Sequence, residues 1–255
     1  MDILSERQNR ILVLARENGR VDVEKLSSTF KVSAQTIRKD LNELCDKQLL
    51  QRIHGGAIVG SGIENVSYEA RHLLAPASKK AIGQLAAGLI PDNSSLLINI
   101  GTTTEQVAHS LCNHRGLLVI TNNINAVEIM KNFLGVELII AGGQVRRSDG
   151  GIIGVAAVDF INQFKVDYAV IGVSAIDEDG SLLDYDYREV RVAQAIINNA
   201  RHVILVTDIM KLERSAPIRI GHISQINTIV IDANLPEKLQ DICSENGVEV
   251  IIAKP

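Results

Sequence analysis

Four short segments of this 255-residue chain combine residue types that bind a phosphorylated small molecule. In the first, Gly101 and three consecutive threonines, Thr102, Thr103 and Thr104, precede a stretch with helical apolar spacing. Free N–H groups and hydroxyls at the start of a helix hydrogen-bond a phosphate, and the helix dipole favours its negative charge. A glycine turn with threonine caps is the alternative interpretation of this motif.

The other three segments supply charged side chains. Glycine-rich residues 142–154 contain Arg146 and Arg147, and two arginines can clamp an anion. Lys211 follows Asp208 by three residues and can reach a phosphate as a point charge. The acidic residues within 184–189 can accept hydrogen bonds from the hydroxyls of a sugar or glycerol. The alternatives are solvated loop charges and carboxylates favoured by a helix dipole.

A different chemistry is indicated near the N-terminus, where residues 34–46 are predicted to form a helix. At 100° per residue, Ile37, Leu41 and Leu44 form a buried stripe, and Asp40 and Glu43 fall to one side. Another sector carries amides and cations together, namely Gln35, Arg38, Lys39 and Asn42. Such side chains hydrogen-bond base edges and contact phosphates. An ordinary solvated face of an amphipathic helix is the alternative.

The elements around this helix favour DNA binding. We expect a helix over residues 7–18 ended by Gly19, a short helix capped by Asp22, and a third helix capped by Ser33. Residues 49–57 then predict a β-ribbon that brings Arg52 and His54 to the phosphate backbone, the arrangement of a winged helix-turn-helix. The candidate DNA-binding residues are Ser33, Gln35, Thr36, Arg38, Lys39, Asn42, Arg52 and His54.

The longer C-terminal part has the pattern of a mainly parallel α/β sheet covered on both faces, because near-continuous apolar runs alternate with helical stretches. The runs are 96–100, 117–121, 136–140, 168–171, 203–206, 228–231 and 248–252. Ligands gather at the carboxyl ends of such strands. The candidate effector-binding residues follow strand-like runs or open helices: Gly101, Thr102, Thr103, Thr104, Arg146, Gly150, Gly151, Asp184, Asp186, Glu189 and Lys211.

Charge divides the chain in the same way. Residues 1–58 carry ten Lys/Arg against eight Asp/Glu, whereas the remainder carries sixteen against twenty-two. A basic head suits a nucleic acid, and an acidic body does not. We therefore predict a DNA-binding domain at 1–58, a glycine-containing linker at 59–75, and a sensor and oligomerisation domain at 76–255. Aromatic residues make up 3% of the chain, which argues against base stacking on aromatic platforms.

Other classes of protein are disfavoured by composition. No run of about 20 apolar residues exists to span a membrane, and the charged start at Asp2 and Glu6 does not read as a signal peptide. The three cysteines are far apart and lack a C-x-x-C motif, so we expect neither disulfides nor a zinc site. The sequence predicts a cytoplasmic protein with no cofactor and no bound metal.

The N-terminal motifs resemble those of the DeoR-type bacterial repressors. The similar residues are 32–44, with Thr36-Ile37-Arg38-Lys39-Asp40-Leu41 at their centre, and Arg52-Ile53-His54-Gly55-Gly56-Ala57. The resemblance implies that the third helix enters the major groove and that Gln35, Thr36, Arg38 and Lys39 contact DNA. It extends over nearly the whole chain, through Ile100-Gly101-Thr102-Thr103, Thr121-Asn122-Asn123, Ala141-Gly142-Gly143 and the Asp208 to Lys211 segment.

For the C-terminal part, the resemblance implies a sensor domain related in fold to ribose-5-phosphate isomerase that binds phosphorylated sugars or polyols. Within the family, residues 146–154 and 180–187 are most similar to members that respond to glycerol 3-phosphate. The chain departs from the family pattern at Ala193-Gln194, where a Lys-Arg pair is usual, and at Leu212-Glu213, where Phe-Gly is frequent. The first departure removes two positive charges near the expected cleft and bears on effector identity and affinity.

Three functions are compatible with these features. The first is a repressor of a carbon-catabolism regulon that binds double-stranded operator DNA as a homo-oligomer, a dimer or tetramer, and is released by a phosphorylated metabolite, either glycerol 3-phosphate or a different sugar phosphate. The second is a sugar-phosphate isomerase that uses the 184–189 acids and Lys211 as acid and base. The third is a constitutive DNA binder. The winged head, for which an isomerase has no use, favours a regulator that is not an enzyme.

Overall fold

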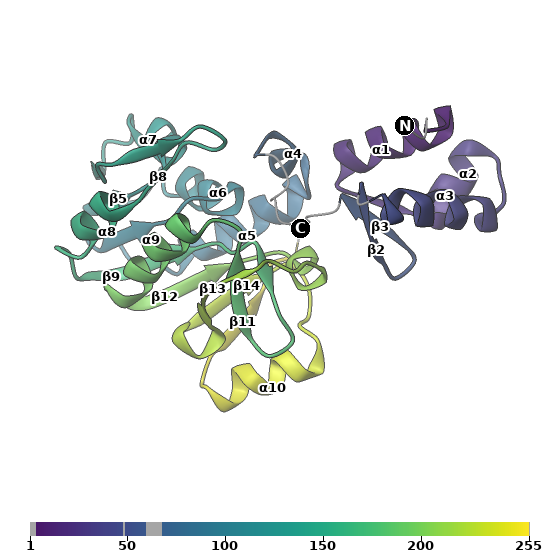
Figure 1. The fold of residues 1–255 in the computed structure, drawn as a ribbon. Coiled ribbons are helices and arrows are strands. Elements are labelled where there is room, and N and C mark those ends of the chain that lie inside the picture. Colours follow the sequence, from purple (N-terminus) through teal and green to yellow (C-terminus); the bar gives the residue numbers. More distant parts are fainter. Residues whose placement is uncertain (1–3, 48, 60–67, 255) are drawn as a thin grey trace. The chain divides into compact units, whose positions relative to one another are not determined.

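The computed structural model describes residues 4–47, 49–59 and 68–254 (Figure 1). The chain divides into two compact units, Met1–Pro76 and Ala77–Pro255. The expected linker at 59–75 lies partly outside the described residues, at 60–67, and partly in helix α4 (Tyr68–Leu73). Among the described helices, none is long and apolar enough to cross a membrane.

Besides α4, the described part of the first unit contains three helices that share one core and a three-stranded antiparallel sheet of order β1-β3-β2. The elements are α1 (Glu6–Asn18), β1 (Arg20–Asp22), α2 (Val23–Phe30), α3 (Ala34–Asp46), β2 (Leu50–Ile53) and β3 (Gly56–Val59). Apolar side chains from all three helices, among them Ile11, Leu26 and Leu41, form one core. The predicted helix-turn-helix followed by a β-ribbon wing is confirmed, and β1 is an addition that the sequence did not indicate.

Local signals set the ends of these helices. Ser5 and Gln8 form a capping box at the start of α1, and Gly19 ends that helix with a φ of 69°. The side chain of Ser33 accepts a hydrogen bond from the N–H of Thr36 and so caps α3 as predicted. Asp22 lies at the N-cap of α2, but its side chain makes no capping hydrogen bond and instead accepts one from Arg20.

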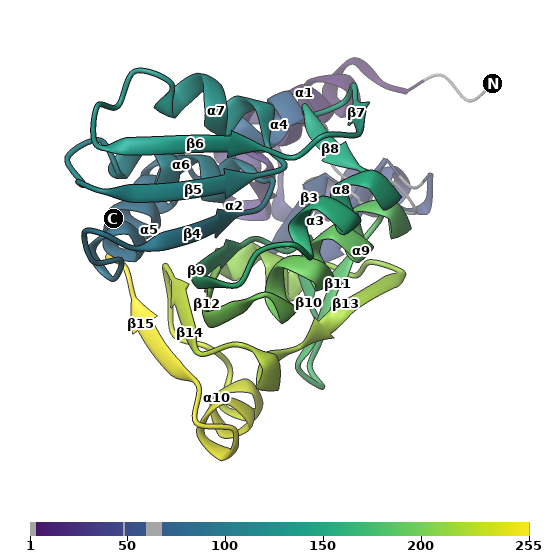
Figure 2. The same ribbon diagram turned by 90° about the vertical axis from the view of Figure 1, so that its left-hand side faces the viewer.

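The second unit is built on a seven-stranded sheet in the order β15-β14-β12-β9-β4-β5-β6 (Figure 2). All six pairings are parallel, and the strands match the seven predicted apolar runs. The strands are β4 (Ser95–Ile98), β5 (Leu117–Thr121), β6 (Val136–Ile140), β9 (Val166–Ile171), β12 (Ala200–Val206), β14 (Thr228–Ile231) and β15 (Glu249–Ile252). Their carboxyl ends therefore meet at one edge of the sheet.

Helices cover both faces of this sheet. One core contains side chains of α5 (Pro76–Gly88), α6 (Thr102–Ser110) and α7 (Ile124–Met130). The other contains side chains of α8 (Val155–Ile161), α9 (Tyr187–Asn198) and α10 (Glu237–Glu245). Helix α6 begins at Thr102 and α9 at Tyr187, which places Thr102–Thr104 and Glu189 in first turns.

Two small antiparallel sheets, absent from the prediction, lie outside the main sheet. The strands of the first, in the order β10-β11-β13, are β10 (Ala175–Ile176), β11 (Ser181–Asp184) and β13 (Ile218–His222). The second is a hairpin of β7 (Gln144–Arg146) and β8 (Gly151–Ile153), and two short 3-10 helices, η1 (Ile209–Glu213) and η2 (Ile223–Gln225), complete the unit. The β7–β8 hairpin lies within the glycine-rich residues 142–154, for which no strands were predicted.

Helix α5 passes close to α6 at Gly83. A Cβ at this position would lie 2.5 Å from the backbone carbonyl carbon of Gln106. Gly83→Ala should therefore lower the free energy of unfolding by about 1–3 kcal/mol, because the two helices must separate. Urea denaturation measures this, with Gly88→Ala as the matched control, since no atom lies within 4 Å of a Cβ there. Equal stability of the two variants would contradict the close helix contact.

Candidate functional sites

Helix α3 presents one polar face to solvent. Its buried stripe of Ile37, Leu41 and Leu44 is fully covered, as the spacing predicts. Side chains on the exposed side line an open groove together with the start of α1. The lining residues are Ser5, Arg7, Gln8, Ser33, Gln35, Thr36, Arg38, Lys39, Asp40, Asn42 and Glu43. Six of the predicted DNA-binding residues thus line one surface groove.

The carboxylates of α3 in this groove are engaged by α1. Arg7 contacts Asp40 through two nitrogens, Nε to Oδ2 at 2.5 Å and an Nη to Oδ1 at 3.1 Å. The Gln8 side-chain amide donates to Glu43 at 2.6 Å. Asp40 is 5% exposed. The exposed charges that α3 brings to the groove are consequently the cations Arg38 and Lys39.

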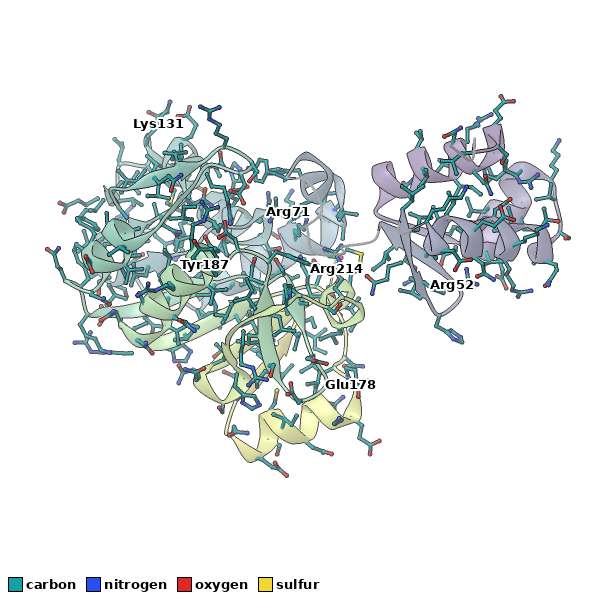
Figure 3. All side chains as sticks on the ribbon, in the orientation of Figure 1. Arg52, Arg71, Lys131, Glu178, Tyr187 and Arg214 are labelled. Atoms are coloured by element: carbon teal, nitrogen blue, oxygen red, sulfur yellow. The ribbon has the colours of Figure 1, made fainter. Side chains whose placement is uncertain are left out.

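The wing supplies the remaining predicted DNA-binding residues. Arg52 lies exposed on β2 (Figure 3). His54 is exposed in the turn to β3. Gly55 closes that turn with a φ of 75°, a left-handed conformation that favours glycine. Helix α3 and the wing therefore both carry exposed cationic or polar groups suited to a nucleic acid backbone.

In the second unit, the start of α6 follows the carboxyl end of β4. Gly101 is its N-cap with a φ of 142° and no side-chain capping bond. Among the described residues, the N–H groups of Thr102, Thr103 and Thr104 have no backbone partner. The Thr104 hydroxyl donates to the carbonyls of Asn99 and Gly101, both at 2.8 Å, so it holds the loop. These backbone N–H groups are donors of the kind that hydrogen-bond an anion at a helix start.

Neighbouring strand ends converge on this helix start. A Cβ at Gly172, just after β9, would lie 3.6 Å from the Thr104 side chain and 4.0 Å from the carbonyl of Val206 at the end of β12. Lys211 lies on η1, which follows β12 and is capped by Asp208 through the N–H of Met210. Lys211 therefore follows the carboxyl end of β12, which is separated by β9 from β4, the strand that precedes α6.

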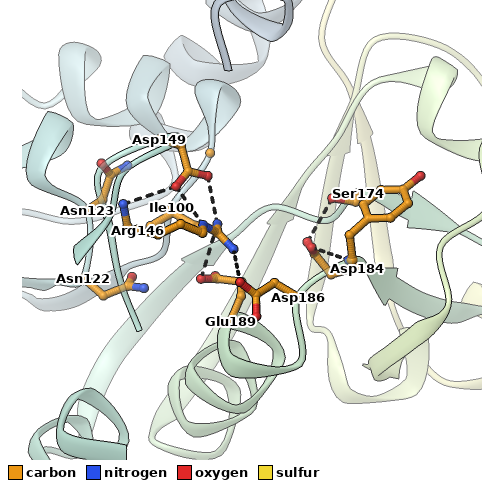
Figure 4. Close-up of polar contacts among 12 residues, drawn as sticks. Ile100, Asn122, Asn123, Arg146, Asp149, Ser174, Asp184, Asp186 and Glu189 are labelled. Atoms are coloured by element: carbon orange, nitrogen blue, oxygen red, sulfur yellow. Dashed lines mark hydrogen bonds and ion pairs between the residues drawn. The ribbon is translucent and has the colours of Figure 1, made fainter. Parts of the chain in front are cut away.

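Arg146 occupies the centre of a polar cluster (Figure 4). Its guanidinium donates to both oxygens of Asp149, at 2.9 and 2.8 Å, and to Asp186 at 3.2 Å. Burial opposes the charge of Arg146, but the hydrogen bonds to Asp149 and Asp186 and the nearby acidic groups together outweigh it and raise the pKa of Arg146. Burial would raise the pKa of Asp186, yet hydrogen bonds from Arg188 and Arg146 lower it to about 2. Arg146 is therefore a bridge between the β7–β8 hairpin and α9, whereas the sequence suggested an anion clamp.

Glu189 is the third carboxylate of this cluster. It is 2% exposed, and its nearest Arg146 nitrogen lies 3.8 Å away. Among the described residues, neither carboxylate oxygen meets the geometry of a hydrogen bond, although Asn99 and Arg146 face it. Burial raises the pKa of Glu189 to about 8, helped by Asp184 and Asp149 and opposed by Arg146. Burial thus outweighs the charge of Arg146, which is already bound to Asp149 and Asp186, and the pKa of Glu189 lies above neutral.

The other predicted ligand-binding residues have internal partners. The N–H of Gly150 donates to the Arg146 carbonyl and closes the hairpin turn, and the N–H of Gly151 donates to Asp149. Asp184 accepts from the Ser174 hydroxyl at 2.9 Å and from the N–H of Tyr185. The glycines therefore shape the hairpin that carries Arg146, and Asp184 lies beside the cluster rather than in it.

Several polar residues at this edge were missed by the sequence analysis. Glu105, 2% exposed, accepts from the side chains of Asn123 and Asn125, and Asn125 also donates to the Asp149 carbonyl. These bonds connect the first turn of α6 to the β7–β8 hairpin. Two asparagines closely follow strands: Asn99 comes directly after β4, and Asn123 comes two residues after β5. These positions could have indicated the site, but Asn99 was included in an apolar run and Asn123 in a family motif.

The departures from the family pattern have a clear location. Ala193 is fully buried one helical turn after Glu189, on the same face of α9. Gln194 is exposed, and its side chain lies 3.5 Å from the Arg219 carbonyl. Residue 193 therefore offers Glu189 an apolar neighbour where a lysine is usual.

A winged helix-turn-helix joined to a parallel α/β domain with a polar, phosphate-compatible strand edge defines a ligand-responsive transcription regulator. Residues 7–61 match the DeoR-like helix-turn-helix domain, and residues 75–233 match the DeoR C terminal sensor domain. The chain belongs to the DeoR family of bacterial transcription regulators.

Relatives similar over nearly the full length are named as repressors. The glycerol-3-phosphate regulon repressor of Escherichia coli (strain K12) is 42% identical over 96% of this chain and 98% of its own. The repressor of the same name from Haemophilus influenzae is also 42% identical, over 97% and 96%. These relatives are named as repressors, the class of protein that was predicted for this chain.

Solved structures share the fold at low sequence identity. A Pyrococcus horikoshii OT3 translation initiation factor eIF-2B has a TM-score of 0.51 at 13% identity, over 89% of this chain and 95% of its own. Ribose 5-phosphate isomerase from Plasmodium falciparum has a TM-score of 0.39 at 16% identity over 52% of each chain, a likeness too weak to carry an argument. The first match supports the α/β fold alone.

Proposed function

We propose that this protein is a repressor that binds operator DNA through α3 and the wing and is released by glycerol 3-phosphate. The observation that carries the proposal is the combination of a DNA-compatible face on α3 with a strand edge that offers both phosphate and hydroxyl partners. The names of the relatives support this effector and a role in carbon catabolism.

For DNA binding, we infer that α3 lies in the major groove. Gln35, Arg38 and Asn42 then meet base edges, whereas Lys39, Arg52 and His54 contact phosphates. A single head offers few such contacts, so symmetry must supply both affinity and half-site specificity. A homo-oligomer, a dimer or tetramer, that binds two half-sites is therefore part of the proposal.

For effector binding, the phosphate is assigned to the N–H groups of 102–104, the hydroxyl of Thr103 and the ammonium of Lys211. The helix start favours an anion, and the lysine adds a charge at the same sheet edge. The hydroxyl end of the ligand is assigned to Glu189 and Asn99, where buried polar atoms face inward. The effector must bind the low-affinity conformation better than the DNA-bound one; a coupling of about 1–3 kcal/mol corresponds to about 5–150-fold release.

The experiment is a fluorescence anisotropy titration on the DNA upstream of this protein's own gene. We expect specific binding that glycerol 3-phosphate relieves and that glycerol or inorganic phosphate alone does not. Relief by another sugar phosphate would support the function as a repressor but assign it a different effector. Absence of specific DNA binding would contradict the proposed function as a whole.

The double variant Thr103→Ala/Lys211→Ala should bind the same DNA as tightly as the parent protein but lose its response to glycerol 3-phosphate. Two of the proposed phosphate partners are removed, so the concentration for half-release should rise about tenfold or more. The same anisotropy titration measures this. Lys238→Ala, on an exposed part of α10, is the control and should respond normally. An unchanged response of the double variant would exclude this phosphate site.

A further inference from the structure

The start of α1 lines the same groove as the polar residues of α3, and two of its side chains bind the acidic residues of that groove. Arg7 donates hydrogen bonds to Asp40 from two guanidinium nitrogens, and the side chain of Gln8 donates to Glu43. These two carboxylates lie one turn apart on α3, beside Lys39 and Asn42 in sequence. Uncompensated, they would repel the phosphates that Arg38 and Lys39 attract.

These contacts between α1 and α3 are largely shielded from solvent. Asp40 and Gln8 are each 5% exposed, and the Arg7 side chain keeps 35% of its exposure. Gln8 uses its other side-chain atom, Oε1, to accept from the N–H of Ser5 in the capping box. Gln8, which helps to cap the start of α1, thus also binds the acidic side of α3. Because two separate points on α3 are held, the rotation of α3 about its axis is fixed.

We propose that Arg7 and Gln8 are positioning residues for operator recognition: they neutralise and hold Asp40 and Glu43, and thereby set the angle at which α3 presents Gln35, Arg38 and Asn42 to base edges. The proposal rests on the proposed binding of operator DNA. Arg7 acts through Asp40 and is not itself a DNA contact. Its loss should therefore reduce discrimination between sequences more than general affinity for DNA.

The test compares two duplexes, one selected by the wild-type protein from a random-sequence library and one with the same bases shuffled. Arg7→Met should lower the ratio of the two affinities about tenfold, a loss comparable to that of one base contact. Arg7→Met/Asp40→Asn, which has the net charge of the wild type, should lower the ratio to the same extent as Arg7→Met, within about twofold, because a purely pairwise contact is lost completely with either partner. Arg10→Met removes one exposed cation from the same helix and should weaken both duplexes equally.

The ratio separates positioning from stability, because a partly unfolded variant loses affinity for both duplexes by the same factor. Arg7→Lys keeps the charge but loses the two-point contact, so its affinity ratio should lie between those of the wild type and Arg7→Met. If Arg7→Met does not fold, a lowered ratio in Arg7→Lys still tests the proposal. An unchanged ratio in Arg7→Met, or a double variant whose ratio falls clearly further than that of Arg7→Met, would overturn the proposal. If the wild type selects no sequence at all, operator binding is itself contradicted and this role falls with it.

Discussion

Glu189→Gln should make the protein more stable at pH 8 than the wild type and leave its stability nearly unchanged close to pH 5. In the unfolded chain this carboxyl releases its proton above its ordinary pKa of 4.5, whereas the folded protein holds it up to about 8. Between these two values the unfolded state binds fewer protons, so rising pH favours unfolding. The cost is at most about 1.4 kcal/mol of unfolding free energy per pH unit.

Glutamine has the shape of the protonated carboxyl and cannot ionise, so the variant should lose this slope. Urea denaturation followed by far-UV circular dichroism at several pH values between 5 and 8.5 measures the difference. Glu245→Gln, an exposed residue at the end of α10, is the matched control and should run parallel to the wild type. A wild-type curve that also runs parallel to that of Glu189→Gln would mean that Glu189 is ionised and compensated in the folded protein.

Arg38→Ala should weaken operator binding by about 10–100-fold without changing the unfolding transition. Its side chain is exposed on α3, opposite the buried stripe, so the core does not depend on it. A bidentate contact from arginine to a guanine edge contributes about 1–3 kcal/mol of discrimination. Fluorescence anisotropy on the selected duplex and on single-base variants of it measures both affinity and the base position at which specificity is lost.

Arg191→Ala provides the control for Arg38, because it removes one exposed cation from the second unit. Its operator affinity should match the wild type. The logarithm of affinity should also fall steeply with the logarithm of salt concentration for the wild type, since phosphate contacts release counterions. An Arg38→Ala variant with wild-type affinity would show that α3 does not dock as proposed.

Much of the fold could be predicted because its signals are local. The strands of the main sheet are continuous apolar runs, and helix starts such as Ser33 carry their own caps. The stripe of Ile37, Leu41 and Leu44 likewise follows from helical periodicity alone. The small antiparallel strands are only two to five residues long, with pairings such as Leu182 to Gly221 that join distant segments, so no periodicity marks them.

The site was harder to predict because its contacts are long-range. Arg146 looked like an anion clamp as long as its partners were unknown, and Asp186 lies 40 positions away in sequence. Similarly, helical periodicity places Asp40 and Glu43 on one side of the helix, and only the fold shows that residues of α1 bind them. The types of these residues indicate polar chemistry, but only the fold decides which charges are compensated within the protein.

The order of strands in the large sheet has a consequence for synthesis on the ribosome. The first strand to emerge, β4, lies inside the sheet, and β5 and then β6 extend it on one side. On the other side β9 pairs with β4, and β12, β14 and β15 then follow, each beside the strand made before it. No strand has to be inserted between two that are already paired. The nascent domain can therefore grow outward from its centre by adding each βα unit to an edge that already exists.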